Sequence, residues 1–185
     1  MNKILPLPVE ILHREVKSPR LFIRPDRVVV ILPSGYDAKF ANLMLERHRR
    51  WIMKKHATLK KASEVYVKLM LENRNMEDFK KIVYDLVEKY SKELKVKPRK
   101  IFFRKMKTRW GSCSGRNNIT INSLLRFLPD ELIEYIIYHE MCHILEKNHG
   151  KTFWRMVHQK FPDSEDKKLK LIAYELKLFD YLPVD

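Results

Sequence analysis

The sequence predicts an α+β protein with small sheets, and two observations lead to this class. Residues 9–33 alternate β-branched or aromatic residues with polar ones and are interrupted by prolines, which is typical of short strands. From residue 37 onward, apolar residues recur every three or four positions in several long segments, which is typical of amphipathic helices. Most helices and strands occupy separate stretches of the chain, so we expect helices packed beside small sheets.

Residues 1–36 are expected to form a small antiparallel β meander. Three runs rich in β-forming residues cover 9–12, 20–24 and 28–32, and prolines stand between them. Because proline has no amide hydrogen for a strand ladder, each one marks a turn. We therefore predict three short strands that pair in chain order.

Residues 37–97 are expected to form a basic helical region. One amphipathic helix is predicted over 37–61 and a second over 76–94, while residues 62–75 follow no clear pattern. Pro98 ends the region, because proline is common just beyond the end of a helix.

Residues 98–185 are expected to form the last unit, although all three segments together could also fold as one compact domain. The segment 101–106 predicts a strand, and 118–122 predicts its partner. Pro129, followed by acidic residues, predicts the start of a strongly apolar helix. Two further helices complete the unit, and the last has an apolar stripe made of Leu169, Ile172, Leu176 and Phe179.

The positive charge is concentrated in two segments, residues 39–61 and 92–109. The chain has a net charge of +15, and these two segments together account for all of it. Two cationic stripes on an otherwise balanced protein can attract an anionic partner such as nucleic acid or a nucleotide. A solvated lysine-rich surface without any partner explains the same pattern.

The composition argues against a membrane protein or a disulfide-stabilised one. No apolar run approaches the length of a membrane span, and the start of the chain is too short and too interrupted by proline for a signal segment. Two cysteines, Cys113 and Cys142, fit a reducing compartment. We therefore expect a cytoplasmic protein with no membrane partner.

The clearest chemical motif lies inside the apolar helix that starts near Pro129. His139 and His143 are four residues apart, which places both imidazoles on one helix face where they can bind one cation. Glu140 lies about 100° round the helix, so it can act on a metal-activated water without being a ligand. Burying these polar groups is costly unless a metal satisfies them, and we predict one Zn²⁺ per chain. The alternative is two partly exposed histidines beside an ordinary glutamate.

A third ligand is needed, and His149 is the first candidate. In a continuous helix it would lie about 240° away from the second histidine, off the metal face, so the helix must end before it. Asn148 and Gly150 favour such a stop, because both tolerate the left-handed conformation that ends helices. A carboxylate such as Glu165 or Glu175 is the alternative third ligand.

Four segments, 106–114, 119–122, 138–143 and 148–154, together resemble the YgjP-like metallopeptidase-domain family, which is related to the WLM and SprT-type zinc proteases. The resemblance implies a zincin-like unit over residues 98–185 and a zinc-dependent hydrolase. It also implies three zinc ligands and one catalytic glutamate, which correspond to His139, His143, His149 and Glu140. One difference is Gly150, where the family usually has serine, which removes a possible hydroxyl near the ligands.

From the motif and the resemblance together, we predict a zinc-dependent metallopeptidase that cleaves peptide or protein substrates with Glu140 as the general base. Two alternatives stay open. One is a metal-dependent hydrolase of a phosphorylated small molecule such as a nucleotide, and the other is a DNA-associated protease that docks through the basic segments. Arg109, Tyr138 and Tyr174 are candidates for stabilising the oxyanion or binding the substrate.

Overall fold

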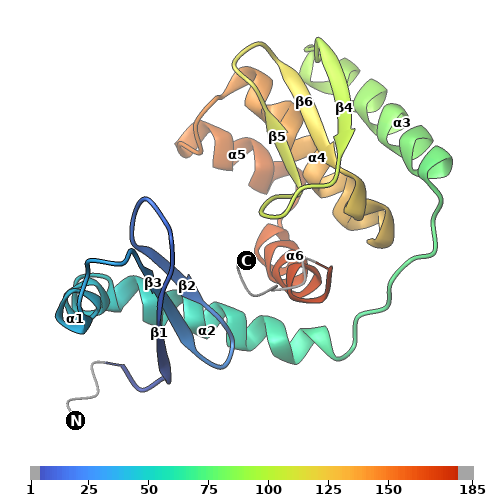
Figure 1. Ribbon diagram of the computed structural model, residues 1–185. Helices are drawn as coiled ribbons and strands as arrows, with labels where there is room; N and C mark the ends of the chain where they lie inside the picture. Colours follow the sequence, from blue (N-terminus) through green and yellow to red (C-terminus); the bar gives the residue numbers. More distant parts are fainter. Residues whose placement is uncertain (1–4, 179–185) are drawn as a thin grey trace. The chain divides into compact units, whose positions relative to one another are not determined.

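The structure is a computed structural model that describes residues 5–178, and the contacts divide the chain into two compact units, Met1–Val67 and Lys68–Asp185. The predicted α+β class is confirmed, because the described residues form helices together with two three-stranded sheets (Figure 1). The boundary between the units falls inside the basic helical region predicted over 37–97. No helix in the described part of the chain is long and apolar enough to cross a membrane.

The sheet of the first unit differs from the predicted antiparallel meander. Its strands are β1 (Val9–His13), β2 (Arg20–Ile23) and β3 (Val28–Leu32), in the order β1-β3-β2, and β1 runs parallel to β3. All five residues of β3 are buried. A strand that is buried on both faces fits the centre of a sheet. The continuous apolar sequence of β3 therefore explains why β3 lies between the more polar strands β1 and β2.

The single helix predicted over 37–61 is two helices. α1 (Ala38–Arg47) and α2 (Arg49–Tyr66) are separated at His48, and α2 extends beyond the predicted end. Asp37 caps α1 by accepting a hydrogen bond from the Phe40 amide, which satisfies one of the free donors of the first turn.

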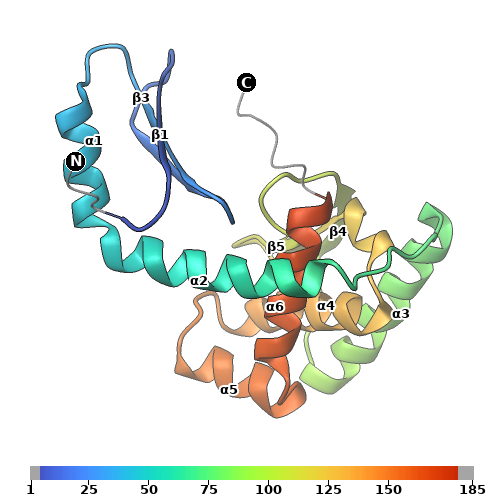
Figure 2. The same ribbon diagram turned by 90° about the horizontal axis from the view of Figure 1, so that it is seen from below.

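The second unit contains α3 (Met76–Leu94), β4 (Lys100–Arg104), β5 (Gly111–Cys113), β6 (Asn118–Asn122), a short 3-10 helix η1 (Ser123–Phe127), α4 (Asp130–Leu145), α5 (Lys151–Lys160) and α6 (Ser164–Leu178). Helix α4 is the centre of this unit, because it packs against α3, β5, α5 and α6. Figures 1 and 2 both show α5 and α6 beside α4. Phe179, the last residue of the predicted apolar stripe, lies outside the described residues.

The sheet of the second unit has the order β4-β6-β5. The predicted pairing of 118–122 with the strand predicted over 101–106 is confirmed: β6 pairs with β4, and the two strands run parallel. Strand β5 was not predicted, because its glycine and serine are typical of turns; it pairs antiparallel to β6. Ile119 and Ile121 of the central strand are fully buried.

Helix α3 has a well-defined start and an unusual end. The Asn75 side chain accepts hydrogen bonds from the amides of Glu77 and Asp78, which are also the acidic residues of the first turn. At the other end Lys95 adopts the left-handed conformation, with φ of 55°. Side chains with a Cβ atom are strained there, and glycine is the usual residue at this position.

We therefore predict that Lys95→Gly raises the free energy of unfolding by about 0.5–1 kcal/mol, because glycine adopts the left-handed conformation without strain. Denaturant unfolding followed by circular dichroism measures this change. Lys92→Gly, inside the last turn of the same helix, is the matched control and should lower stability by about 1 kcal/mol. Destabilisation by both substitutions would contradict the prediction.

Candidate metal centre

Three histidines converge at the C-terminal half of α4. His139 and His143 lie one turn apart on α4, and His149 comes from the loop that follows. The Nε2 atom of His149 is 3.0 Å from Nε2 of His139 and 3.2 Å from Nε2 of His143. One ligand atom from each of the three lies within 4.8 Å of the others, so the group could hold a metal ion. The structure thus brings together the three histidines that the sequence indicated.

The helix ends before His149, as expected, but by a different route. α4 stops at Leu145, and Glu146 turns into an extended conformation with φ of −124°. Neither Asn148 nor Gly150 is left-handed, so the predicted glycine-type stop is wrong. The loop that carries His149 then leads directly into α5, which begins at Lys151.

The end of the helix also orients one ring. Nδ1 of His143 lies 2.9 Å from the carbonyl oxygen of Glu146. Because a carbonyl oxygen can only accept, this contact places the proton on Nδ1 and leaves the lone pair of Nε2 directed at the cluster. The extended conformation at Glu146 that ends the helix therefore also leaves Nε2 of His143 able to bind a metal.

Aromatic rings surround the histidines. Phe153 is fully buried, and its ring stacks on His143 with centroids 4.4 Å apart and contacts His139 at 4.8 Å. Trp154 stacks on His149 with centroids 5.5 Å apart, and the Lys168 amino group lies 3.8 Å from the Trp154 centroid. Both aromatic residues belong to α5, so this helix holds the imidazoles in place.

The surroundings of His139 and His149 favour the neutral imidazole, which is the form that binds metals. Burial, followed by the charges of His143, His149 and Lys168, lowers the pKa of His139 to about 3. Burial, followed by His143 and Lys168, also lowers the pKa of His149. Neutral imidazoles do not have to lose a proton before they bind a cation, so proton competition at neutral pH is small.

Glu140 lies between the histidine cluster and β5. Its side chain is buried, and a Cβ atom added at Gly111 would lie 2.7 Å from both Cγ and Oε1 of Glu140. The absence of a side chain at Gly111 therefore allows the strand to pass directly over the carboxyl group. A glycine within a strand often marks such a close approach of other atoms.

The Glu140 carboxyl group is buried and has an oxygen atom without a partner. Its Oε2 atom is buried without a hydrogen-bond partner, as is Nδ1 of His139. Burial raises the pKa of Glu140 to about 8, and the positive charge of Arg109 opposes this shift. Leaving a buried carboxyl oxygen without a partner is costly, and carboxyl groups with a shifted pKa are common at functional sites.

Gly111→Ala is expected to lower the free energy of unfolding by about 1–3 kcal/mol, because the new methyl group would overlap the Glu140 side chain in a packed region. Thermal or denaturant unfolding measures this loss. Gly115→Ala is the matched control, since no atom lies within 4 Å of a Cβ at that position. Equal stability of the two variants would show that β5 does not pass so closely over Glu140.

Asn122 holds the loop before β5 and was missed by the sequence analysis. It is fully buried, and its Nδ2 donates hydrogen bonds to the carbonyl oxygens of Met106 and Arg109. Its Oδ1 accepts from the amides of Met106 and Leu124. The signal in the sequence was a polar residue at the end of an otherwise apolar strand, where a buried amide must find partners.

The three candidates for oxyanion or substrate contact, Arg109, Tyr138 and Tyr174, have different surroundings. The positive charge of Arg109 opposes the rise in the pKa of the Glu140 carboxyl group. The Tyr138 hydroxyl lies 3.5 Å from the Met156 carbonyl oxygen, and its ring packs against Tyr90. The Tyr174 hydroxyl donates to the Met70 carbonyl oxygen at 2.8 Å. Of these candidates, Arg109 acts on Glu140 through its charge, whereas both tyrosine hydroxyls face main-chain carbonyl oxygens.

The alternative carboxylate ligands are not part of the cluster. The metal-ligating group found among residues 5–178 consists of the three histidines and includes neither Glu165 nor Glu175. Glu165 is paired with Lys168 at 2.6 Å on α6.

The chain was also compared with known families and structures. The YgjP-like metallopeptidase domain matches residues 60–174, well over half of the chain, including the histidine cluster. Among solved structures, the metallopeptidase zymogen abylysin of Pyrococcus abyssi is 27% identical, covers 52% of this chain and 94% of its own, and has a TM-score of 0.45. The metallopeptidase zymogen jannalysin of Methanocaldococcus jannaschii is 25% identical, covers 52% and 97%, and has a TM-score of 0.44. No curated protein matches the chain significantly.

Proposed function

This chain belongs to the YgjP-like metallopeptidase domain family and is a metal-dependent protease, and we propose that its metal is a single Zn²⁺ held by His139, His143 and His149, with Glu140 as the general base. The observation that carries this proposal is the convergence of three imidazole nitrogens beside a buried, unpartnered carboxyl group.

The donor set fits zinc. Three nitrogens bound to a tetrahedral zinc at about 2.0–2.1 Å stand about 3.3 Å apart, close to the 3.0 and 3.2 Å between the Nε2 atoms here. Three neutral imidazoles without a carboxylate ligand favour zinc over magnesium or calcium, which prefer oxygen. Three protein ligands also leave one coordination position open, as in catalytic zinc sites.

The residues of the chain divide the chemistry between them. When bound, the metal supplies Lewis-acid chemistry: it makes a water acidic and polarises a carbonyl group. Glu140 takes the proton of the attacking water on its carboxylate and passes it to the leaving amine. A base works best with a pKa near the working pH, and burial has moved the pKa of Glu140 in that direction, to about 8. Arg109 opposes this shift and helps to keep the carboxylate form available.

The edge strand beside Glu140 fits a peptide substrate. Asn122 donates to the Trp110 carbonyl oxygen across the β5–β6 pair, and bonding alternates along an antiparallel ladder. The main-chain groups of Gly111 and Cys113 therefore point to the open edge of the sheet. A substrate strand that pairs with this edge would place its backbone next to Glu140. This arrangement supports a peptide substrate more than a phosphorylated small molecule.

Substrate screening of the zinc-loaded protein tests the proposal. We expect hydrolysis of an unstructured protein or a quenched peptide library, loss of activity with a chelator, and recovery when zinc is added. Release of pyrophosphate or phosphate from nucleoside triphosphates, without peptide cleavage, would instead support the small-molecule alternative. Cleavage of protein only when DNA is present would support a DNA-associated protease.

A further inference from the structure

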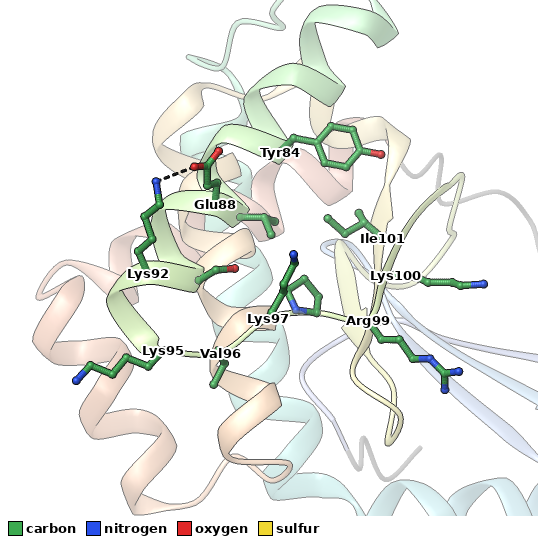
Figure 3. Close-up of a pocket in the computed structure, with 12 residues that line it drawn as sticks. Tyr84, Glu88, Lys92, Lys95, Val96, Lys97, Arg99, Lys100 and Ile101 are labelled. Carbon is green, nitrogen blue, oxygen red and sulfur yellow. Dashed lines mark hydrogen bonds and ion pairs between the residues drawn. The ribbon is translucent and has the colours of Figure 1, made fainter.

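A groove lies between α3 and β4, at the opposite edge of the sheet from the metal centre. Its volume is about 760 Å³, and residues from the second half of α3 and from the segment leading into β4 line it. Figure 3 shows the Lys97 side chain between the helix and the strand, with the Tyr84 ring extending from α3 towards Ile101. Strand β6 separates this groove from β5 and Glu140.

The floor of the groove is apolar. Val87 from α3, Val96 and Pro98 from the connecting segment and Ile101 from β4 line it. Tyr84 stands at one end with half of its surface exposed, 51%. This floor can bury aliphatic side chains of a ligand, so the groove is more than a charged surface.

The rim of the groove is cationic. Lys97, Arg99 and Lys100 line it and are exposed, and in the described part of the chain none of them forms an ion pair. The single acidic residue of the lining, Glu88, is already paired with Lys92 at 2.7 Å. The charge of the groove is therefore available to a carboxylate partner.

The groove runs beside the open edge of β4. Asn122 of the central strand bonds to β5, so Ile119 and Ile121, on the alternate positions, bond to β4. Their register partners are Ile101 and Phe103. In a parallel ladder, a residue bonds to the two residues on either side of its register partner. The register partner itself directs its amide and carbonyl groups away from that neighbouring strand. The main-chain groups of Ile101 and Phe103 are therefore directed to the open edge.

We propose that this groove binds an extended, acidic segment of a polypeptide, which adds a strand to β4 and lies against α3. Along such a strand, successive side chains point to opposite sides. One set of side chains packs on the apolar floor, and the other places carboxylates near Lys97, Arg99 and Lys100. The groove contains none of the proposed metal ligands. Peptide binding in the groove can therefore be tested separately from the proposed peptidase chemistry.

The same observations favour a polypeptide over a nucleic acid. The rim alone would suit phosphate groups, but phosphates carry no donors for the outward carbonyl oxygens of Ile101 and Phe103. A polypeptide main chain supplies both donors and acceptors at the strand spacing. The apolar floor likewise fits aliphatic side chains better than a sugar-phosphate backbone.

Binding of a labelled peptide to the full chain tests the proposal. The probe is a fluorescent peptide of about ten residues that alternates Glu with Val, an extended pattern with one acidic and one apolar face. We expect saturable binding that weakens about 10-fold in the double variant Lys97→Glu, Lys100→Glu, because two attractive rim charges become repulsive. Amide hydrogen exchange by NMR should slow at Ile101 and Phe103 when the peptide binds.

Two matched comparisons separate this site from general charge attraction. Lys54→Glu makes the same kind of charge reversal at an exposed lysine of α2 and should leave binding within about 2-fold. The same peptide with Gln in place of Glu should bind about 10-fold more weakly. Equal weakening by the Lys54 variant, unchanged exchange at Ile101 and Phe103, or tighter binding of a single-stranded oligonucleotide through the same lysines would each overturn the proposal.

Discussion

Glu140→Gln is expected to reduce peptide hydrolysis by on the order of 10²–10⁴-fold while the protein keeps its metal. Glutamine has nearly the same shape as glutamate but cannot take a proton from the attacking water. Glu140 is not one of the candidate metal ligands, which are the three histidines, so its replacement should leave metal binding intact. The loss should therefore appear in kcat and not in metal content.

Two measurements make the Glu140 result decisive. Elemental analysis should give the same metal content in the variant and the unchanged protein. Glu146→Gln is the matched control, because Glu146 contacts the cluster through its main-chain carbonyl oxygen, and this substitution should keep activity within a few-fold. Full turnover by the Glu140 variant would exclude it as the general base.

His149→Ala is expected to weaken metal binding by roughly 100–1000-fold, because it removes one of three ligands and metal affinity is the sum of a few strong bonds. His149 is exposed and belongs to a loop, so its replacement costs little of the folding free energy. Loss of metal can therefore be distinguished from loss of the fold, which is harder at the buried His143.

Metal content after dialysis against graded chelator concentrations measures the effect of His149→Ala, and circular dichroism reports the fold. His158→Ala is the matched control, since His158 stacks on Trp154 but lies outside the ligand group. It should keep full metal content. Unchanged metal binding in the His149 variant would place the third ligand elsewhere and would refute the three-histidine centre.

The helices were the most predictable part of the fold. α3 was predicted with its observed bounds, and α4 began where Pro129 and its acidic neighbours indicated, because spacing and capping act within a few residues. Strand β5 and the parallel pairing of β1 with β3 were not predicted. Pairing depends on which distant segments share a core, and short strands contain little local information about it.

The candidate metal centre was likewise predictable in part. The spacing of His139, Glu140 and His143 on one helix already defines two imidazoles on one face and a carboxyl group beside them. Whether His149 returns to that face depends on how the chain leaves α4, and the predicted left-handed stop at Asn148 and Gly150 is replaced by an extended Glu146.

The sequence by itself determined α3, the start of α4, the charge distribution and the residue types of a candidate metal site, because these follow from spacing along a few turns. Only the tertiary structure decided that β5 passes over Glu140 at Gly111, that Phe153 and Trp154 hold the imidazoles, and that β4 leaves an open edge beside α3. These contacts join residues distant along the chain. They form because burying apolar surface in one core offsets the entropy of closing the loops between them.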